Sequence, residues 1–138
     1  MIDGVIIKKI ISKNDYRGFF REIMKETDKY TNAKFKQFSH SKINKSIKKG
    51  WHVHKKQYQW NYLIKGKIEV YLLDLRKKSK TYKEQKKFIV SSKKPIIYFF
   101  PPHVAHGYIT LEKDNHIIYA TSGVYSKLEQ YKLPFIKT

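Results

Sequence analysis

Two short histidine-rich stretches are the parts of this sequence best suited to chemistry. The first is Gly50-Trp51-His52-Val53-His54, and the second, at residues 101–107, reads Pro-Pro-His-Val-Ala-His-Gly. Histidine titrates closest to neutral pH and also ligates metals, so converging imidazoles usually mark a proton-transfer or metal site. Apolar runs flank both stretches. We therefore predict that the fold brings these imidazoles together inside a small β-barrel.

The spacing within the first stretch indicates which histidines act together. Side chains alternate between the two faces of a strand, so His52 and His54 point to the same face. Two imidazoles on an inward face are costly to bury alone, and we expect them to be paired, liganded or catalytic. His106 completes the predicted trio. The other histidines are interpreted as surface or structural residues: His40, His103 and His116.

The elements that must position these histidines have the composition of short strands. Residues 5–11 are β-branched, and residues 34–39 alternate between polar and apolar side chains. Residues 60–64 and 68–75 flank Gly66 and predict a β-hairpin. Further elements are a short helix at 126–131 and strands at 88–90, 96–100, 106–111 and 116–121.

This succession of short strands and turns predicts an all-β sandwich or barrel. No linker, repeat or low-complexity boundary interrupts it, so we expect one domain over residues 1–138. The chain has no cysteine, which excludes a disulfide framework, a zinc–thiolate site and a thiol nucleophile. No apolar run reaches the roughly 20 residues that span a bilayer, and the N-terminus does not resemble a secretory signal. We expect a cytoplasmic protein with no membrane partner.

The formal net charge of +19 requires an explanation. Clustered lysine and arginine are typical of nucleic-acid binding, but here lysine supplies all but three of the 30 cations and is spread along the chain. Helical and zinc-finger signatures of nucleic-acid readers are missing. A lysine-rich surface around a pocket for an anionic small molecule explains the charge equally well. We expect no nucleic-acid partner.

The three arginines stand out in a chain that otherwise uses lysine. They are Arg17, Arg21 and Arg76. A planar guanidinium is preferred where phosphate or carboxylate must be held by two parallel hydrogen bonds. Arg17 lies in a turn, Asp-Tyr-Arg-Gly-Phe-Phe at 15–20, between aromatic side chains. We interpret Arg17 as an anion-binding residue and Arg21 as an ordinary surface cation.

The two histidine stretches together resemble the paired motifs of the cupins. Residues 50–66 resemble the first motif, with Gln59 where glutamate is usual and Gly66 at the expected glycine. Residues 101–106 resemble the second motif, with His103 in place of its glycine. Their order and separation imply a cupin jelly-roll barrel, a double-stranded β-helix.

Within the cupins, residues 5–130 resemble the dTDP-4-dehydrorhamnose 3,5-epimerase family. The family abstracts a proton beside the 4-keto group of a nucleotide-linked 6-deoxysugar and returns one to the opposite face. The resemblance lies in segments 15–22, 37–41, 47–52, 66–70, 74–81 and 105–108, and in Tyr119 followed by Tyr125. It implies a cofactor-independent isomerase in surface-polysaccharide or deoxysugar synthesis, which acts as a homodimer.

The same resemblance implies a role for individual residues. His52 would be the base and Tyr125 the acid, on opposite sides of the sugar ring. The implied substrate contacts are Arg17, Phe20, Glu22, Gln37, Lys49, His54, Gln59, His106 and Tyr119. The family's enolate-stabilising lysine falls on Gln59 and its phosphate-binding arginine on Lys49. Its carboxylate that orients the base histidine is expected beyond Thr138.

Three alternatives share the fold. The cupin 3,4-ketoisomerases of dTDP-4-keto-6-deoxyglucose have a similar Gly-x-His-x-His run, and there His52 and His54 would shuttle protons between C3 and C4. A metal-dependent cupin would hold a divalent ion with four ligands: His52, His54, Gln59 and His106. A binding module would keep the sugar nucleotide without turning it over.

Overall fold

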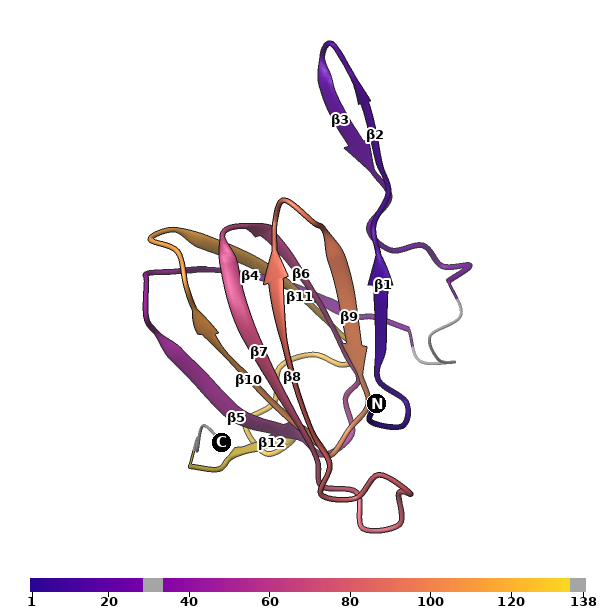
Figure 1. Cartoon of the computed structure of the whole chain (residues 1–138). Helices are drawn as coiled ribbons and strands as arrows, with labels where there is room; N and C mark the ends of the chain where they lie inside the picture. Colours follow the sequence, from indigo (N-terminus) through magenta and orange to yellow (C-terminus); the bar gives the residue numbers. More distant parts are fainter. Residues whose placement is uncertain (29–33, 135–138) are drawn as a thin grey trace.

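The computed structural model describes residues 1–28 and 34–134, and over these residues the chain is all-β without a helix. The all-β prediction is thus confirmed. Two antiparallel sheets face each other and enclose the core, as Figure 1 shows. Within the described residues no helix is long and apolar enough to cross a membrane.

The first sheet combines strands from both ends of the chain. Its order is β1 (Ile6–Lys9), β9 (Ile96–Phe100), β6 (Gln59–Lys65), β11 (Asn115–Thr121) and β4 (Gln37–Ile43). The second sheet has the order β12 (Gln130–Lys132), β5 (Lys48–His54), β10 (Val104–Thr110), β7 (Lys67–Asp74) and β8 (Gln85–Ser91). This arrangement places the two histidine stretches, on β5 and β10, side by side in one sheet.

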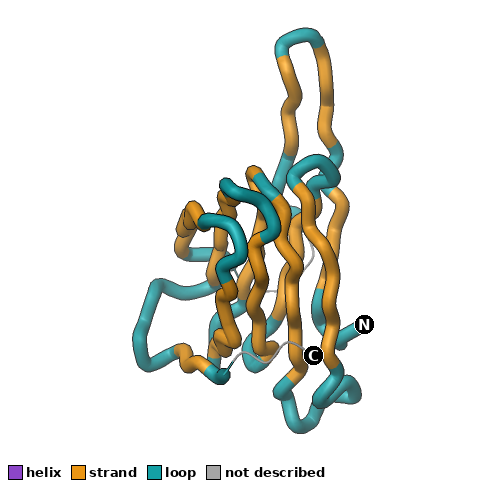
Figure 2. Tube along the Cα trace, turned by 60° about the vertical axis from the view of Figure 1, so that its left-hand side comes forward, coloured by secondary structure: helices purple, strands orange, loops and turns teal. Residues whose placement is uncertain are grey.

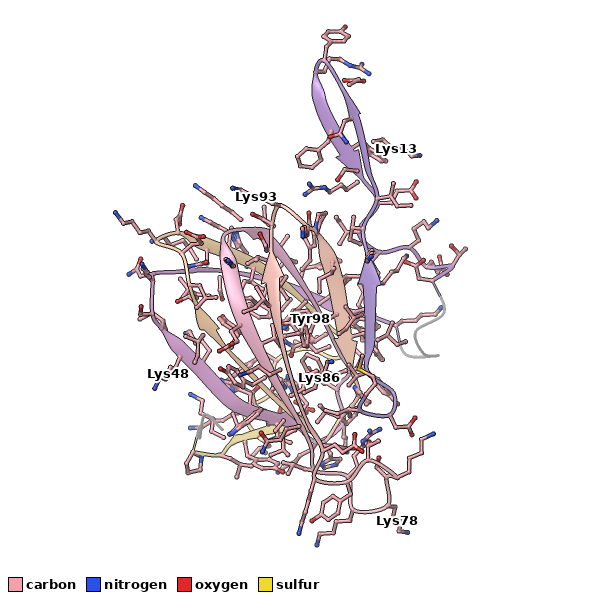
Figure 3. All side chains as sticks on the ribbon, in the orientation of Figure 1. Lys13, Lys48, Lys78, Lys86, Lys93 and Tyr98 are labelled. Carbon is pink, nitrogen blue, oxygen red and sulfur yellow. The ribbon has the colours of Figure 1, made fainter. Side chains whose placement is uncertain are left out.

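The core lies between the two sheets, where alternate side chains of each strand meet. On β7, Ile68, Val70 and Leu72 are completely buried, and Tyr98 and Phe100 of β9 pack against the same cluster. Burying these apolar side chains supplies the main drive for folding. Figure 3 shows Tyr98 inside the barrel, whereas most of the labelled lysines lie on its outside. The lysine-rich composition therefore belongs to the solvated surface.

The predicted hairpin around Gly66 is wrong. β6 pairs with β9 and β11, whereas β7 pairs with β10 and β8, so the two strands belong to opposite sheets. Gly66 makes the turn between the sheets with a φ of 100°, and a Cβ there would collide with the Asn115 side chain. Two apolar strands joined by a tight turn have the same local pattern whether they pair or cross between sheets.

The predicted helix at 126–131 is also wrong. A turn, closed by the hydrogen bond from the Glu129 N–H to the Ser126 carbonyl at 3.1 Å, leads into β12. β12 then pairs with the edge strand β5, with Gln130 opposite His54 and Lys132 opposite His52. Pairing with this otherwise open sheet edge satisfies backbone groups that a short, isolated helix would leave to water.

A separate hairpin extends away from the barrel. Among the described strands, β2 (Ser12–Asp15) and β3 (Gly18–Arg21) pair only with each other, and Figures 1 and 2 show them projecting beyond both sheets. Phe19 and Phe20 on this hairpin are exposed. A two-stranded hairpin is marginally stable in water by itself, so we expect this hairpin to be stabilised by packing against another surface.

Candidate active site

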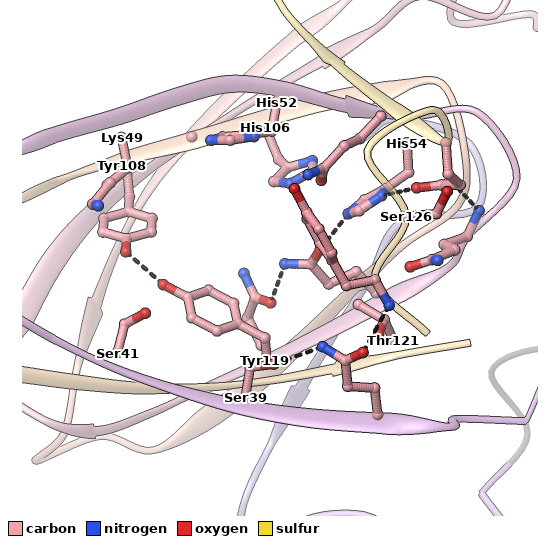
Figure 4. Close-up of a pocket in the computed structure, with 18 residues that line it drawn as sticks. Ser39, Ser41, Lys49, His52, His54, His106, Tyr108, Tyr119, Thr121 and Ser126 are labelled. Atoms are coloured by element: carbon pink, nitrogen blue, oxygen red, sulfur yellow. Dashed lines mark hydrogen bonds and ion pairs between the residues drawn. The ribbon is translucent and has the colours of Figure 1, made fainter. Parts of the chain in front are cut away.

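A polar cavity of about 310 Å³ opens between the two sheets. Figure 4 shows its side chains converging from β4, β5, β6, β10, β11 and the segment before β12. Of the predicted site residues, the structure brings together His52, Tyr125, Gln37, Lys49, His54, Gln59, His106 and Tyr119. Residues as far apart in the sequence as Gln37 and Tyr125, 88 positions, therefore share one cavity, while their roles remain predictions.

The three histidines of the predicted trio lie in one row. His106 on β10 is the cross-strand partner of His52 on β5. The His106 ring lies 6.0 Å from that of His52 and 5.4 Å from that of His54, measured between centroids, and is nearly parallel to both. Gly50 permits this approach, because a Cβ there would collide with the backbone of His106 and Gly107. The local bulge between His106 and Tyr108 accommodates the contact.

His52 has the environment of a neutral base. Burial lowers the pKa of the His52 ring below its ordinary value, and nearby positive charges lower it further, in the order Lys132, His54 and Lys49. In the described part of the chain its ring nitrogens have no hydrogen-bond partner. The unprotonated imidazole is thus the stable form at neutral pH and retains a lone pair that can accept a proton.

His106 is neutral for a stronger reason. It is almost completely buried, and this burial is the largest cause that holds the pKa of the His106 ring well below its ordinary value. Its Nδ1 lies 3.3 Å from the Val104 carbonyl oxygen, which can accept only from a protonated nitrogen. Nδ1 therefore carries the proton, and Nε2 is left as the acceptor of the ring.

His54 differs from the other two histidines because both of its ring nitrogens are engaged. Nδ1 lies 2.6 Å from Oε1 of Glu129, and Nε2 lies 2.8 Å from Oε1 of Gln59. The second oxygen of Glu129 accepts the backbone N–H groups of Lys56 and Gln57, at 2.9 and 2.8 Å. A carboxylate does bind a cavity histidine, but its partner is His54, two residues beyond the expected base.

Glu129 and Asn61 are site residues that the sequence-based prediction missed. Asn61 donates to the Tyr98 hydroxyl at 2.9 Å and accepts from the Gln59 amide at 2.7 Å. Asn61 could have been identified as a polar residue within the otherwise apolar run at 60–64. Glu129 gave a weaker signal, as one of only 11 acidic residues in a strongly basic chain.

Two tyrosines line the opposite wall of the cavity. The hydroxyls of Tyr108 and Tyr119 are 2.6 Å apart, as Figure 4 shows. Burial is the largest cause that raises the pKa of both phenols above the ordinary value. Both therefore stay protonated at neutral pH, and the pair offers hydroxyl groups rather than a charge to anything in the cavity.

Tyr125 stands at the mouth of the cavity. Its side chain is 65% exposed, while its backbone N–H donates to Oε1 of Gln37 at 2.7 Å. Gln37 in turn donates to the Ser39 hydroxyl at 3.0 Å. Gln37 therefore fixes the backbone of the segment that carries the predicted acid, and the phenol itself is accessible to a ligand.

Three predicted substrate contacts lie outside this cavity. Arg17 is at the tip of the projecting hairpin and forms an ion pair with Asp15 at 2.6 Å. Phe20 is 60% exposed on the same hairpin, and Glu22 follows it with an ion pair to Lys25 at 3.4 Å. Within one chain these residues cannot contact a ligand held by His52.

The ligand set of a metal-dependent cupin is not assembled. In the described ranges, 1–28 and 34–134, no three side chains of His, Cys, Asp or Glu are placed to share a metal ion. Both His54 nitrogens already have protein partners, and Gln59 directs its carbonyl oxygen to His54. The donors named for the metal alternative are therefore committed to each other.

A two-sheet antiparallel barrel with a histidine-lined cavity at one end defines the cupin class of jelly rolls. The solved structure of the 3,5-epimerase RmlC from Legionella pneumophila, in complex with dTDP-4-keto-L-rhamnose, superimposes with a TM-score of 0.92 at 22% identity, over 99% of this chain and 76% of that one. The dTDP-4-dehydrorhamnose 3,5-epimerase of Sulfolobus tokodaii superimposes with a TM-score of 0.89 at 29% identity, over 96% and 78%. The predicted cupin fold is confirmed.

Sequence comparison gives the family. Residues 1–135 match the family model described as dTDP-4-dehydrorhamnose 3,5-epimerase. The spore coat polysaccharide biosynthesis protein SpsL of Bacillus subtilis is 38% identical over 127 residues, which cover 91% of this chain and 83% of SpsL. The chain belongs to the dTDP-4-dehydrorhamnose 3,5-epimerase family, as its motifs predicted.

Proposed function

We propose that this protein is an epimerase that inverts C3, C5 or both in a dTDP-linked 4-keto-6-deoxyhexose. The observation that carries the proposal is a neutral His52 that faces a polar cavity whose mouth carries an exposed Tyr125. Among the described residues, the ring nitrogens of His52 have no hydrogen-bond partner. Family membership supports the substrate class. The relationship to SpsL supports a place in surface-polysaccharide synthesis.

The chemistry requires a base and an acid on opposite faces of one sugar ring. A ring nitrogen of His52 takes the proton from the carbon beside the ketone, and the electron pair of that C–H bond forms the enolate. The Tyr125 hydroxyl then gives a proton to the other face of the same carbon. His52 releases its proton to solvent and the phenolate regains one, so that no proton is gained or lost overall.

Lys49 and Gln37 are the residues of the cavity that we assign to the nucleotide. Lys49 lies on β5 opposite Tyr108, and both line the cavity in Figure 4. Its ammonium supplies a point charge for a diphosphate, where the family's arginine would supply a two-pronged hydrogen-bond donor. His106, Gln59 and Tyr119 would then surround the sugar, deeper in the cavity.

The hairpin residues are assigned to the site of a second copy of the chain, in a homodimer. One support is the exposure of Phe19 and Phe20 on a hairpin whose strands join neither of the two larger sheets of the described residues. Another is an apolar groove of about 780 Å³ on the outer face of the first sheet, which we call the outer groove. It is lined by residues 21–25, 35, 38–40, 60, 62, 64, 97, 118 and 120. In such a dimer Arg17, Phe20 and Glu22 would reach the nucleotide held by the partner.

The 3,4-ketoisomerase alternative shares the substrate and the enolate but needs a second proton carrier beside His52. His54 would have to fill that role, and both its ring nitrogens are held by Glu129 and Gln59. This arrangement favours epimerisation, because the proton must then return from the Tyr125 side.

Proton NMR of dTDP-4-keto-6-deoxyglucose incubated with the protein in D₂O tests the proposal. Deuterium at C3, C5 or both, with inverted products, is the expected result and counts the carbons involved. Migration of the carbonyl to C3 would identify the ketoisomerase. Tight nucleotide binding without any exchange would leave a binding module and overturn the proposal.

A further inference from the structure

We propose that Gln57 is a positioning residue for the predicted acid Tyr125. Together with Gln37 it holds both polar groups of the peptide unit between Val124 and Tyr125, and it thereby determines where the phenol returns the proton. We call the two glutamine side chains and the peptide unit between them the amide clamp. The inference rests on the proposed function, because it concerns the proton-return step, whereas the clamp itself is a feature of the protein without substrate.

The segment that carries Tyr125 has little apolar packing to hold it. Residues 122–129 connect β11 to β12 and lie outside the strands. The side chains of Val124, Tyr125 and Leu128 in this segment are all largely exposed. Apolar burial therefore contributes little to the position of the segment, and its hydrogen bonds must supply most of the restraint.

Both polar groups of one peptide unit are held by side-chain amides. The Val124 carbonyl accepts a hydrogen bond from Nε2 of Gln57 at 3.0 Å. The N–H of Tyr125, which belongs to the same peptide unit, donates to Oε1 of Gln37 at 2.7 Å. The unit is planar and its two polar groups point in opposite directions, so hydrogen bonds on both edges oppose its rotation. They thereby fix the Cα from which the phenol projects.

The orientation of each amide follows from its backbone partner. A carbonyl oxygen only accepts, so the Gln57 atom that faces Val124 is the nitrogen. A backbone N–H only donates, so the Gln37 atom that faces Tyr125 is the oxygen. None of these four groups titrates near neutral pH, so the clamp does not depend on the protonation of the cavity histidines.

Gln57 is itself held in place on several sides. It is buried, and its backbone N–H donates to Oε2 of Glu129 at 2.8 Å. Gly123 lies directly against its side chain, because a Cβ on Gly123 would come within 2.8 Å of Nε2 and 3.1 Å of Cδ of Gln57. The glycine therefore leaves the space that the amide of Gln57 occupies.

Gln37 has a second assignment, to the nucleotide, and for this reason Gln57 is the residue to change. Nε2 of Gln37 donates to the Ser39 hydroxyl at 3.0 Å. An amide nitrogen carries two hydrogens, so a contact with the nucleotide is compatible with the clamp. A variant of Gln37 would alter both functions at once, whereas a variant of Gln57 acts on the clamp.

A loosened clamp should affect one half of the reaction. His52 removes the proton beside the ketone, and in D₂O its ring exchanges that proton for a deuteron. The electron pair of the enolate can then take a deuteron by two routes. Return from His52 to the original face gives labelled substrate, and transfer from Tyr125 to the other face gives inverted product. Misplacing the phenol slows only the second route, so exchange without inversion should gain relative to inversion.

Initial rates of both routes in D₂O, measured by proton NMR at saturating dTDP-4-keto-6-deoxyglucose, test the inference. Gln57→Met keeps a side chain of similar length and removes the donor to Val124. The rate of inversion should fall by roughly tenfold or more with little change in KM, while exchange without inversion persists. Gln85→Met is the matched control, because Gln85 is exposed on β8 and does not line the cavity. An unchanged ratio of the two rates in Gln57→Met would overturn the inference.

Gly123→Ala tests the same contact from the other side. The new methyl group would displace the amide of Gln57 without removing any polar group. Gly123 has no positive φ, so its backbone conformation is open to alanine. We expect the same shift toward exchange without inversion. If Gln57→Met does not fold, an unchanged ratio in Gly123→Ala overturns the inference.

Hydrogen exchange of the Tyr125 amide, followed by NMR without any sugar nucleotide, separates this inference from the proposed function. Its protection should fall by about tenfold in Gln57→Met and stay unchanged in Gln85→Met. If the unaltered protein does not act on dTDP-4-keto-6-deoxyglucose, the proposed function is wrong, and the lost protection still supports the clamp. If inversion occurs while Gln57→Met keeps the parent's protection and ratio, the proposed function is supported and the clamp is overturned.

Discussion

The polar cavity and the outer groove lie on opposite faces of the same sheet, and the polar groups that face them differ in their hydrogen bonding. Inside, the hydrogen bonds run without a break from Glu129 through His54, Gln59 and Asn61 to Tyr98. Outside, the groove is mainly apolar, and the buried indole nitrogen of Trp60 has no hydrogen-bond partner among the described residues.

This difference separates the residues assigned to proton transfer from those assigned to nucleotide binding. The residues assigned to proton transfer come from the chain itself, and hydrogen bonds to neighbouring side chains hold His54, Gln59 and Asn61 beside them. The residues assigned to the nucleotide are instead divided between the cavity and a hairpin that extends away from it. We therefore expect changes inside the cavity to affect the chemical step, and changes outside it to affect assembly and substrate binding.

The largest effect should come from the base. In His52→Asn, the rate of deuterium incorporation at saturating substrate should fall by about 10²- to 10⁴-fold, because the variant has no group that can accept the proton. KM should change little, since the base acts in the transition state. NMR or stopped-flow kinetics measure this rate, and circular dichroism checks that the variant is folded. A variant that retains full turnover would show that the base is a different residue.

A charge placed in the outer groove should act on assembly. Phe38 is exposed at the edge of the groove and packs on Phe35 with a centroid distance of 4.9 Å. In Phe38→Glu, the dissociation constant of the dimer should rise by about tenfold or more, since the carboxylate would lose its water in the interface. Analytical ultracentrifugation measures this constant.

Ile89→Glu is the matched control for this change, because Ile89 is an exposed apolar residue on β8 of the other sheet. We expect it to leave the dimer intact. Equal weakening of the dimer by both variants, or a monomeric parent protein, would remove the outer groove from the interface.

The pH dependence of stability should originate inside the cavity. His106 is neutral in the folded protein, with a pKa held well below the ordinary value by burial, whereas in the unfolded chain that value is about 6.5. The unfolded state then binds more protons below that pH, so the free energy of unfolding falls as the pH decreases from about 6.5. The limiting slope is about 1.4 kcal/mol per pH unit for one such group.

Urea unfolding at a series of pH values measures this slope. His106→Asn should reduce it, and the remaining part would come from His52, whose pKa is also lowered in the folded protein. The exposed Asp15–Arg17 pair on the hairpin provides the contrast, because Asp15→Asn should leave the slope unchanged over the same range. A slope that is undiminished in His106→Asn would show that His106 does not cause it.

How much of this site could be predicted depends on the range of each interaction. Strand alternation is local, and it correctly placed His52 and His54 in one cavity. The two motifs predicted the cupin fold, and further segments along the chain predicted the family. His54 differs from His52 in its hydrogen bonds to Glu129 and Gln59, and Glu129 is 75 positions from His54 in the sequence. No local pattern encodes which of two equivalent imidazoles a distant carboxylate will reach.

The wrong hairpin around Gly66 and the unplaced hairpin residues have a related cause. The sequence at 60–75 determines that two apolar strands are joined by a tight turn, but the other strands of the barrel determine which sheet each one joins. Arg17 was predicted from its residue type and turn, which do not determine where the hairpin lies relative to the cavity. In both cases the missing information lies in tertiary or quaternary packing.

The smallest expected effect concerns Trp60 and Asn61, two neighbours on β6. The Asn61 side chain faces the cavity and the Trp60 side chain faces the outer groove. Asn61 is buried in the cavity network, and Asn61→Leu would leave the Gln59 amide and the Tyr98 hydroxyl short of one partner each, at a cost of about 1–3 kcal/mol in stability. Trp60→Phe removes an N–H that has no partner in the described part of the chain, so the lost hydrogen bond should cost nothing. Its remaining cost is the volume lost from a ring that packs on Phe99 at 5.0 Å.

We therefore expect Trp60→Phe to change the free energy of unfolding by less than about 1.5 kcal/mol, the range of conservative apolar exchanges. Measuring both variants in the Phe38→Glu background keeps dimer formation from contributing. A Trp60→Phe cost equal to that of Asn61→Leu would mean that the indole N–H has a hydrogen-bond partner within one chain. The cavity and the outer groove would then not differ in how their polar groups are paired.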